Sequence, residues 1–251
     1  MDETLPTDPS QFRIKIFADG ADREAIAELY PLPWVRGFTT NPTLMRQAGV
    51  EDYETFAREV LEVVHDRPIS FEVFSDEPSE MEEQARTIST WGENVFVKIP
   101  ITDTHGRPST ELAKRLAGSG VKLNVTALMT PEQVAMVADW LATGPPGFVS
   151  VFAGRIADTG RDPIPLMSEC LDILRPHTHL ELIWASPREV LNIVQAAAIG
   201  CHVITVTHDL LRKLSSLGRD LDDFSLATVK MFHDDGQAAG YSLRTIAGTP
   251  R

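Results

Sequence analysis

Cysteine is scarce in this chain, since only Cys170 and Cys201 occur among its 251 residues. Two cysteines are too few for a disulfide framework, and neither belongs to a C-x-x-C pair. The first eleven residues carry acidic side chains and prolines instead of a basic start and an apolar run, and no stretch has the apolar length of a membrane span. We therefore expect a cytoplasmic protein that does not interact with a membrane.

Basic residues are also in short supply, because 23 Lys and Arg stand against 36 Asp and Glu and leave a net charge of −13. A surface of that charge repels a phosphate backbone, so nucleic acid is not expected as a partner. An anionic substrate would have to be held by a few locally placed arginines.

The composition is otherwise that of a globular protein with a sizeable core, at 43% hydrophobic residues. Short apolar runs rich in β-branched and aromatic residues alternate along the chain with amphipathic helical patterns. Eight strands are predicted at 14–18, 34–38, 69–74, 95–99, 121–126, 148–152, 180–185 and 202–206. Helices are predicted at 25–30, 53–64, 80–91, 109–117, 132–141, 165–174, 188–198 and 209–214.

This alternation predicts an α/β fold with a parallel sheet, because right-handed crossovers place the helices on the faces of the sheet. Eight units in about 200 residues favour a (β/α)8 TIM barrel, with an open doubly wound sheet as the alternative. No GxGxxG or GxxxxGK[ST] motif follows a predicted strand, which disfavours a nucleotide cofactor. We expect one domain over residues 1–251, with a barrel core at about 12–217 and an additional C-terminal helix at about 222–240.

Two proline positions predict where helices begin. Thr130-Pro131 and Ser186-Pro187 each place a hydroxyl side chain before a proline, the pattern of an N-cap followed by the first helical residue. Helices are accordingly expected to start at these two pairs.

Polar residues at the C-terminal ends of the strands are the candidate site residues, because the chemistry of such barrels takes place there. They are Asp19; Thr39 and Asn41; Glu72; Lys98; Asn124 and Thr126; Ser150 and Arg155; Ser186 and Arg188.

Lys98 is the most informative of them, because the strand around it is otherwise apolar. Burial disfavours the charged form of an amine, and the neutral amine is a nucleophile that can form a Schiff base with a ketone. Lys15 and Lys122 stand at the starts of their strands, on the face that serves stability. The alternative for Lys98 is a lysine that reaches solvent or pairs with a carboxylate.

Glu72 and Asp19 are the acid/base candidates, since imine chemistry needs proton transfer at the carbinolamine and at the hydroxyl that becomes an aldehyde. Thr126 could hold a catalytic water against Glu72. The alternative for the two carboxylates is a salt bridge to Lys98 that neutralises buried charge, and for Thr126 an ordinary strand threonine.

Arg155, Arg188 and Ser186 form a candidate phosphate site, because guanidinium groups match phosphate oxygens in geometry. The alternative is a pair of surface arginines. His177 and His179 have the spacing of metal ligands, but they precede a strand and lie at the wrong end of the barrel. We expect no metal site and no organic cofactor.

Several motifs follow one another in a specific combination. They are Phe17-Ala18-Asp19, GFTTNPTL at 37–44, VKIP at 97–100, NVT at 124–126, SVFAGRI at 150–156 and Ala185-Ser186. In this order they resemble the transaldolase family, from the first strand to the seventh.

The resemblance implies a class I aldolase-type barrel in which Lys98 forms an imine with a ketose phosphate. It implies further that Asp19 acts on the departing hydroxyl, and that Glu72 and Thr126 orient a water that shuttles protons. The implied contacts to a dihydroxyacetone fragment come from Asn41, Asn124 and Ser150, and those to phosphate from Arg155, Ser186 and Arg188. Thr39 and Phe152 complete the candidate substrate-binding set.

One branch of the family transfers the three-carbon unit to an aldose acceptor, and a branch of smaller chains cleaves fructose 6-phosphate directly. The smaller branch typically has Gln and Tyr where this chain has Glu72 and Phe152, so the chain resembles the transferases. Val151 replaces a usual proline, Pro187 replaces an aromatic residue, and the loop at 102–109 is longer. Such loops bear on the substrate more than on the chemistry.

We therefore predict transfer of a dihydroxyacetone unit between sugar phosphates. The alternatives are a lyase that releases dihydroxyacetone, a transaldolase that builds unusual long-chain sugars, a metal-dependent aldolase and a catalytically silent barrel that binds a ligand. Small relatives form symmetric oligomers, often through the C-terminal helix, and residues 222–239 permit a homo-oligomer of that kind.

Overall fold

The structure, a computed structural model, describes residues 6–243. Its eight strands close into a parallel barrel in which each strand pairs with the next in sequence and β8 pairs with β1. The strands are β1 (Lys15–Asp19), β2 (Val35–Thr39), β3 (Ile69–Glu72), β4 (Val95–Pro100), β5 (Leu123–Leu128), β6 (Gly147–Val151), β7 (Leu180–Trp184) and β8 (Val203–Thr207). The predicted (β/α)8 barrel is confirmed, and the closure of the sheet excludes the open alternative.

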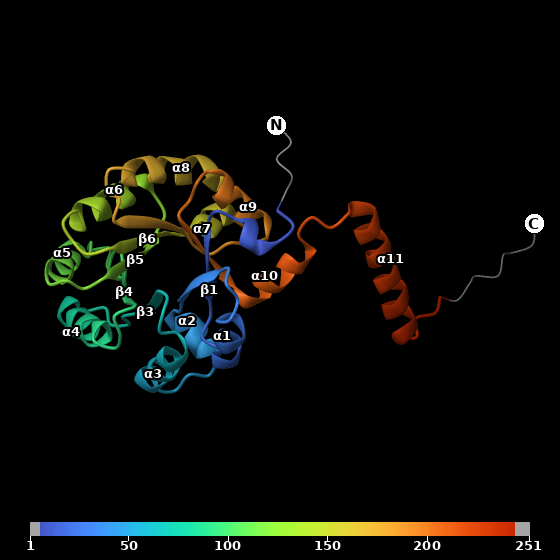
Figure 1. Cartoon of the computed structure of the whole chain (residues 1–251), viewed down its shortest axis with the longest axis horizontal. Coiled ribbons are helices and arrows are strands. Elements are labelled where there is room, and N and C mark those ends of the chain that lie inside the picture. Colours follow the sequence, from blue (N-terminus) through green and yellow to red (C-terminus); the bar gives the residue numbers. More distant parts are fainter. Residues whose placement is uncertain (1–5, 244–251) are drawn as a thin grey trace, which may run out of the picture. The chain divides into compact units, whose positions relative to one another are not determined.

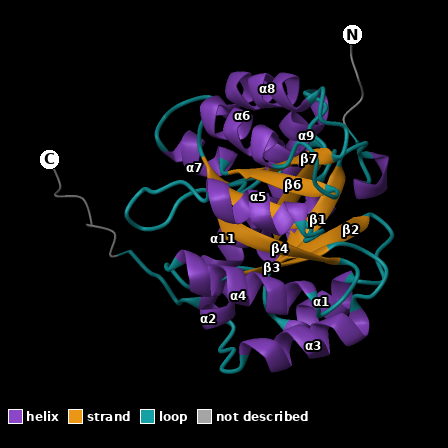
Figure 2. Cartoon of the chain, turned by 90° about the vertical axis from the view of Figure 1, so that its left-hand side faces the viewer, coloured by secondary structure: helices purple, strands orange, loops and turns teal. Residues whose placement is uncertain are grey.

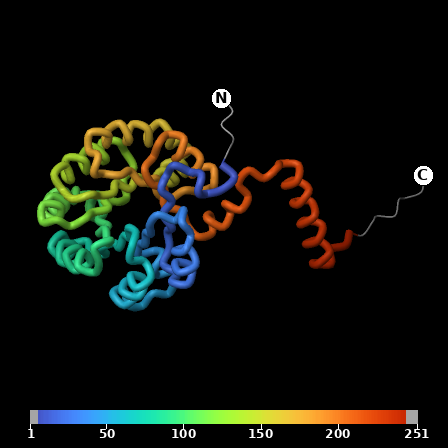
Figure 3. The backbone as a smooth tube through the Cα atoms, viewed as in Figure 1, coloured from blue at the N-terminus to red at the C-terminus, as the bar shows by residue number. Residues whose placement is uncertain are grey.

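Helices follow the strands and lie on the outside of the barrel, as Figures 1 and 2 show. They are α1 (Arg23–Leu29), α2 (Pro42–Gln47), α3 (Tyr53–Val63), α4 (Pro78–Ser89), α5 (Thr110–Gly118), α6 (Pro131–Trp140), α7 (Ala153–Asp158), α8 (Pro163–Leu174), α9 (Leu191–Ala198) and α10 (His208–Arg212), with short 3-10 turns at Pro9–Gln11 and Lys213–Ser216. The tube in Figure 3 runs once around the barrel, from β1 in blue to α10 in orange, which packs against β1.

Every observed strand boundary lies within two residues of its prediction, whereas two short helices, α2 and α7, were not expected. Thr130 caps α6 as predicted, with Pro131 at the first helical position. The second predicted helix start is wrong, because α9 begins at Leu191. Ser186 instead adopts a left-handed backbone with φ of 61°.

The interior of the barrel has two layers, because alternate residues of each strand point inward. The layer in the middle of the strands is apolar and includes Phe17, Phe96, Phe148, Ile183 and Val203. The ring of Phe148 packs on Phe96 and Phe17, at centroid distances of 4.4 and 5.5 Å. The next inward-facing residues toward the C-terminal ends of the strands form a polar layer. They are Asp19, Thr39, Glu72, Lys98, Asn124, Ser150 and Thr205.

Glycine at position 37 makes room for the apolar layer. A Cβ atom there would lie 2.6 Å from the ring of Phe17, closer than packed side chains approach. The glycine of the GFTTNP motif is thus explained by packing, and it lies two residues before the polar Thr39.

Two compact units make up the described chain. One spans Asp8–Leu214 and contains the barrel, and the other contains residues 6–7 and 215–243. The second unit holds the additional helix α11 (Leu221–Ala238), whose N-cap Asp220 accepts backbone N–H groups of the first turn. The expected single domain over residues 1–251 stays a prediction. In the described part of the chain, no helix combines the length and apolar character that crossing a membrane requires.

Candidate active site

One cavity of about 590 Å3 opens at the C-terminal ends of the strands and gathers the whole predicted set. All twelve candidate residues line it: Asp19, Thr39, Asn41, Glu72, Lys98, Asn124, Thr126, Ser150, Phe152, Arg155, Ser186 and Arg188. The roles of these residues stay predictions, whereas their convergence on one cavity is a property of the structure.

Lys98 and Glu72 form an ion pair in this cavity. They lie in register on the neighbouring strands β4 and β3, and Lys98 Nζ is 3.1 Å from Glu72 Oε2. Lys98 is 6% exposed, and its Nζ also donates to the backbone carbonyl of Thr40 at 2.8 Å. The salt bridge considered as an alternative is therefore present, and it places a proton acceptor directly beside the amine.

Tyr53 fixes the strand end that carries Glu72. Its hydroxyl donates to the backbone carbonyl of Glu72 at 2.7 Å, and its ring packs edge-on against Phe71. Burial raises the pKa of Tyr53, so the phenol stays protonated and keeps donating at any physiological pH. The backbone of β3 is thereby held from outside the barrel while the Glu72 carboxylate faces the cavity.

Asp19 is the second carboxyl group of the cavity. Its Oδ1 accepts a hydrogen bond from Thr39 Oγ1 at 2.7 Å. Burial raises the pKa of Asp19, and the charge of Lys98 and the hydrogen bond from Thr39 oppose this rise. A carboxyl group whose pKa is raised exchanges its proton more readily near neutral pH, as acid/base catalysis requires.

Thr126 has a buried hydroxyl that finds no hydrogen-bond partner among residues 6–243. The next residue, Ala127, also lines the cavity and has a left-handed backbone with φ of 66°, a conformation that costs free energy in a residue with a side chain. A buried hydroxyl is normally satisfied, so a water or a substrate hydroxyl is the expected partner at this position.

Asn124 and Ser150 are joined in the polar layer. Ser150 Oγ donates to Asn124 Oδ1 at 2.7 Å, and Asn124 Nδ2 donates to Ser70 Oγ at 3.0 Å. Asn41 instead caps α2, where its Oδ1 accepts the backbone N–H of Leu44 at 3.0 Å. These contacts fix the orientation of both amides toward the cavity.

The predicted phosphate residues come together through a close approach of two backbones. Gly154, at the start of α7, packs on Ser186, and a Cβ atom there would lie 1.5 Å from the Ser186 carbonyl oxygen. Glycine is therefore required at this point, and the approach places Arg155 beside the loop of Ser186 and Arg188. The Arg155 guanidinium lies over the ring of Phe152, 5.2 Å from its centroid.

Asp158 occupies part of this arginine pair. Its carboxylate accepts from Arg188 Nε at 3.0 and 3.2 Å and also pairs with Arg188 Nη2. The hydrogen bond from Arg188 lowers the pKa of Asp158, and the charges of Arg188 and Arg155 add to this effect. Arg155 makes no ion pair within the described residues. A carboxylate thus takes one side of the Arg188 guanidinium, while Arg155 is available to an anionic ligand.

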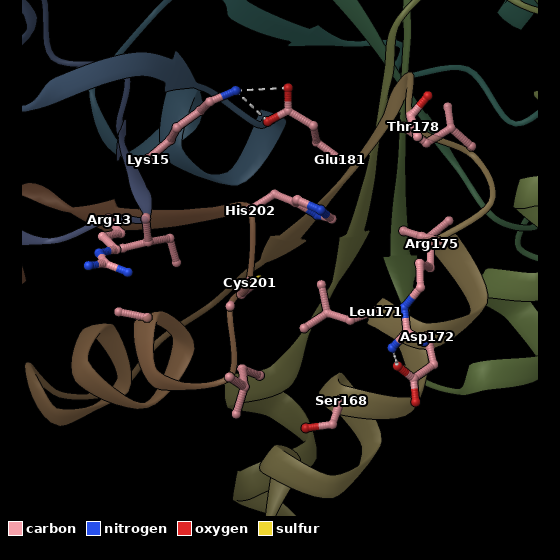
Figure 4. A pocket seen from close by; sticks show the side chains of 16 residues that line it. Arg13, Lys15, Ser168, Leu171, Asp172, Arg175, Thr178, Glu181, Cys201 and His202 are labelled. Carbon is pink, nitrogen blue, oxygen red and sulfur yellow. Dashed lines mark hydrogen bonds and ion pairs between the residues drawn. The ribbon is translucent and has the colours of Figure 1, made fainter. Parts of the chain in front are cut away.

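A larger cavity, of about 810 Å3, lies at the opposite end of the barrel and is shown in Figure 4. It is lined by the starts of β1, β7 and β8, and its charges are largely paired, Lys15 with Glu181 and Arg175 with Asp172. Burial lowers the pKa of His202 there, and its Nδ1 accepts the backbone N–H of Leu182. This end of such barrels serves stability, and the apolar layer separates it from the candidate active site.

Some residues of the cavity were not predicted, among them Gln47, Thr205 and Thr207. Thr205 stands two residues after the inward-facing Val203, so the alternation of β8 could have identified it. The loop at 102–109 contributes no residue to the lining among the described residues, because its Asp103 carboxylate folds it back by accepting the N–H groups of His105 and Arg107.

His177 and His179 lie near one another at a ring centroid distance of 6.4 Å, and His179 Nε2 contacts the carbonyl of Leu141. Across residues 6–243, no three side chains of His, Cys, Asp or Glu converge in a way that would hold a metal ion.

The model of the Transaldolase/Fructose-6-phosphate aldolase family matches residues 16–247. Proteins described as "Probable transaldolase" from Streptococcus equi subsp. zooepidemicus (strain MGCS10565) and Dehalococcoides mccartyi (strain ATCC BAA-2266 / KCTC 15142 / 195) are 37% and 34% identical, each over 80% of this chain and 90% of the relative. Among solved structures, a mandelate oxidase superposes with a TM-score of 0.55 at 12% identity, covering 80% of this chain and 67% of that chain. The N-acetylmannosamine-6-phosphate 2-epimerase from Clostridium perfringens superposes with a TM-score of 0.51 at 10% identity, covering 80% of this chain and 89% of that chain. At these identities the superpositions show the barrel fold alone.

Proposed function

Because this chain belongs to the transaldolase/fructose-6-phosphate aldolase family and is an enzyme of the transaldolase type, we propose that it transfers a dihydroxyacetone unit through a Schiff base on Lys98. The donor in this proposal is a ketose phosphate, and the acceptor is an aldose phosphate. Neither a metal nor an organic cofactor takes part.

The observation that carries the proposal is the Lys98–Glu72 pair inside the cavity. An imine requires an amine that can lose its proton and stay out of water, and Lys98 is buried with a carboxylate oxygen 3.1 Å from its nitrogen. Transfer of the ammonium proton to Glu72 leaves a neutral amine and a neutral carboxylic acid, so no unpaired charge is created in the barrel.

The first half of the reaction forms the imine and breaks the sugar. Lys98 Nζ attacks the ketone carbon of the donor, and the carbinolamine loses water when its hydroxyl takes a proton, for which Glu72 is the donor. Asp19 then accepts the proton of the hydroxyl on the carbon that departs, and the bond between this carbon and the three-carbon unit breaks. That oxygen becomes an aldehyde, the shortened aldose phosphate leaves, and the electron pair stays on the three-carbon unit as an enamine.

The second half reverses these steps on the acceptor. The enamine carbon attacks the acceptor aldehyde, Asp19 returns its proton to the new hydroxyl, and water hydrolyses the imine to release the product ketose and the free amine. Thr126 is positioned to hold the water of the proton transfers, since its buried hydroxyl lacks a partner in the described chain. Asn41, Asn124 and Ser150 would bind the hydroxyl groups of the three-carbon unit.

The arginines account for how a chain of net charge −13 binds an anion. Arg155 and Arg188 would contact the phosphate together with Ser186, and all three residues line the same cavity as Lys98. Guanidinium groups bind phosphate through paired hydrogen bonds, which orients the sugar with its ketone toward the amine.

Borohydride trapping tests the proposal. The protein is incubated with fructose 6-phosphate and sodium borohydride and then digested, and the mass of the Lys98 peptide is measured by mass spectrometry. We expect this mass to increase by one reduced three-carbon or six-carbon sugar adduct. Lys122→Met, at the other end of the barrel, should be trapped like the wild type, and Lys98→Met should not. An unmodified Lys98 peptide in active protein would overturn the imine.

Product analysis separates transfer from cleavage. With fructose 6-phosphate alone, a transferase releases little dihydroxyacetone, and addition of an aldose phosphate yields a new ketose phosphate. The presence of Glu72 and Phe152, in place of the Gln and Tyr typical of the smaller branch, favours the transferase. Free dihydroxyacetone at the same rate with and without an acceptor would show a lyase, and a new long-chain sugar would show a specialised transferase. Product formation that is the same in wild type and Lys98→Met would show that the barrel is catalytically silent.

We also propose that the enzyme works in the cytoplasm as a homo-oligomer. The helix α11 carries exposed apolar side chains, among them Phe224, Val229, Met231 and Phe232, and an amphipathic helix of this kind is typical of an interface. Light scattering on the full chain, with Phe232→Glu as the variant, tests this: a loss of mass per particle in the variant supports it, and a monomeric wild type contradicts it.

A further inference from the structure

Two buried threonines connect Asp19 to the strand β8. Thr39 Oγ1 lies 2.7 Å from Asp19 Oδ1 and 2.5 Å from Thr205 Oγ1. Thr39 is 3% exposed and Thr205 is 6% exposed. The three side chains come from β1, β2 and β8 and face the same inner layer of the barrel.

The direction of these hydrogen bonds follows from the number of protons available. A threonine hydroxyl has one proton to donate. When Asp19 is ionised it can only accept, so Thr39 donates to Asp19 and Thr205 has to donate to Thr39. When Asp19 is protonated, it can donate to Thr39, and Thr39 can turn its own proton to Thr205. The two hydroxyls can thus reverse by rotation alone, with no proton passing between residues.

We propose that Thr205 is a positioning residue for Asp19, which it supports through Thr39 in a hydroxyl chain that reverses when Asp19 gains or loses its proton. The link to catalysis depends on the acid/base role proposed for Asp19, whereas the hydrogen-bonded chain of Thr205, Thr39 and Asp19 does not. Thr205 touches no reacting atom in this proposal.

The charged groups that act on Asp19 are Lys98 on β4 and Glu72 on β3. The hydrogen bond from Thr39 lowers the pKa of Asp19, against the effect of burial. A hydroxyl that accepts one hydrogen bond donates a stronger one, because successive hydrogen bonds polarise each other. Thr205 therefore strengthens the hydrogen bond by which Thr39 stabilises the ionised carboxylate of Asp19.

Titration of Asp19 tests the chain without reference to activity. Protein labelled with 13C at the aspartate carboxyl carbons is titrated by NMR, and the resonance missing from Asp19→Asn identifies Asp19. Thr39→Val should raise the pKa of Asp19 by about one unit, since a hydrogen bond to a charged group is lost. Thr205→Val should raise it by a few tenths of a unit, in line with a strengthening of roughly 10–30% per bond. Thr205→Ser keeps the hydroxyl and should restore the wild-type value.

The double variant Thr39→Val, Thr205→Val gives the sharpest result. If Thr205 acts through Thr39, the pKa of Asp19 in the double variant equals that in Thr39→Val, because the path is already broken. Two results would overturn the proposal. One is a shift of the Asp19 pKa by Thr205→Val that is the same in the wild type and in Thr39→Val, and the other is no shift by Thr205→Val in the wild type. Thr207→Val removes a neighbouring hydroxyl of the same strand and cavity, and it should leave the pKa of Asp19 unchanged.

The pH profile of kcat/KM then connects the chain to the reaction. Its acidic midpoint should move upward in Thr205→Val by the shift seen in the titration, with borohydride trapping on Lys98 retained. Failure of trapping in the wild type would contradict the proposed function and leave the titration result valid. Trapping with an unmoved midpoint, together with a moved titration, would show that Asp19 is not the group that limits the rate, and would overturn the link from Thr205 to catalysis.

Discussion

Lys98 Nζ and Glu72 Oε2 lie 3.1 Å apart on neighbouring strands whose backbones are in register at these two residues. The side chains are 8% and 18% exposed, so each group depends on the other for the compensation of its charge. The same arrangement that supplies a proton acceptor to the amine therefore also determines the stability of the barrel.

Lys98→Met should destabilise the protein by about 2 to 3 kcal/mol. Removal of one partner of a fully buried ion pair costs roughly 3–5 kcal/mol, and the residual exposure of Glu72 reduces this figure. The double variant Glu72→Gln, Lys98→Met should recover most of the loss, because no unpaired charge remains. Urea unfolding of the wild type, Lys98→Met, Glu72→Gln and the double variant gives the comparison. A single variant as stable as the wild type would show that Glu72 is solvated independently of Lys98.

Asp158→Asn should lower KM for a phosphorylated donor by about threefold and leave kcat unchanged. The substitution frees the Arg188 guanidinium and removes a negative charge beside the proposed phosphate site. The effect is expected to be small, because both side chains of this ion pair are exposed and solvent screens their charges. Asp172→Asn breaks the comparable Arg175 pair at the other end of the barrel, and its KM should match that of the wild type. A raised KM in Asp158→Asn would mean that Asp158 orients Arg188 for the substrate.

Gly154→Ala should disrupt the phosphate site and destabilise the protein by about 3 kcal/mol. The new Cβ atom would lie 1.5 Å from a backbone oxygen of Ser186, which cannot rotate away as a side chain can. Overpacking typically costs roughly 1–3 kcal/mol, and contact with a backbone places this case at the upper end. Gly118→Ala, where no atom lies within 4 Å, should be neutral or slightly stabilising. Thermal unfolding and KM of both variants provide the test.

Asp19→Asn should stabilise the protein near neutral pH and have little effect below pH ~4. The pKa of Asp19 is raised on folding, so between its unfolded and folded values the native state binds more protons than the unfolded state. Stability therefore falls in the wild type as the pH rises through the folded pKa, and asparagine avoids this loss. The difference in melting temperature between variant and wild type should increase with pH. A difference of the same size at every pH would show that Asp19 is not protonated on folding.

The sequence predicted the strands because each is a short apolar run, and it predicted the site because the ends of these runs carry polar residues such as Lys98 and Asn124. The link between Thr39 and Thr205 could not be read in the same way. These residues are 166 positions apart, and they meet only because β8 closes the barrel on β1. Likewise, the pairing of Asp158 with Arg188 depends on the course of two loops that no periodic pattern describes.

The start of α9 shows a local limit of the same kind. Ser186-Pro187 has the composition of a helix start, yet the side chain of Asn192 accepts the N–H groups of Arg188 and Glu189 and delays the helix to Leu191. This contact comes from within the following segment and outweighs the preference of the serine and proline.

The aromatic layer of Phe17, Phe96 and Phe148 lies beneath the polar groups, and the candidate cavity opens at the C-terminal ends of the strands. In the proposed transfer, both sugars would use this opening in turn. The shortened donor would depart before the acceptor arrives, and in the interval the enzyme alone would hold the three-carbon unit. The lifetime of this intermediate against hydrolysis would decide whether the three-carbon unit is transferred to an acceptor or released into solution.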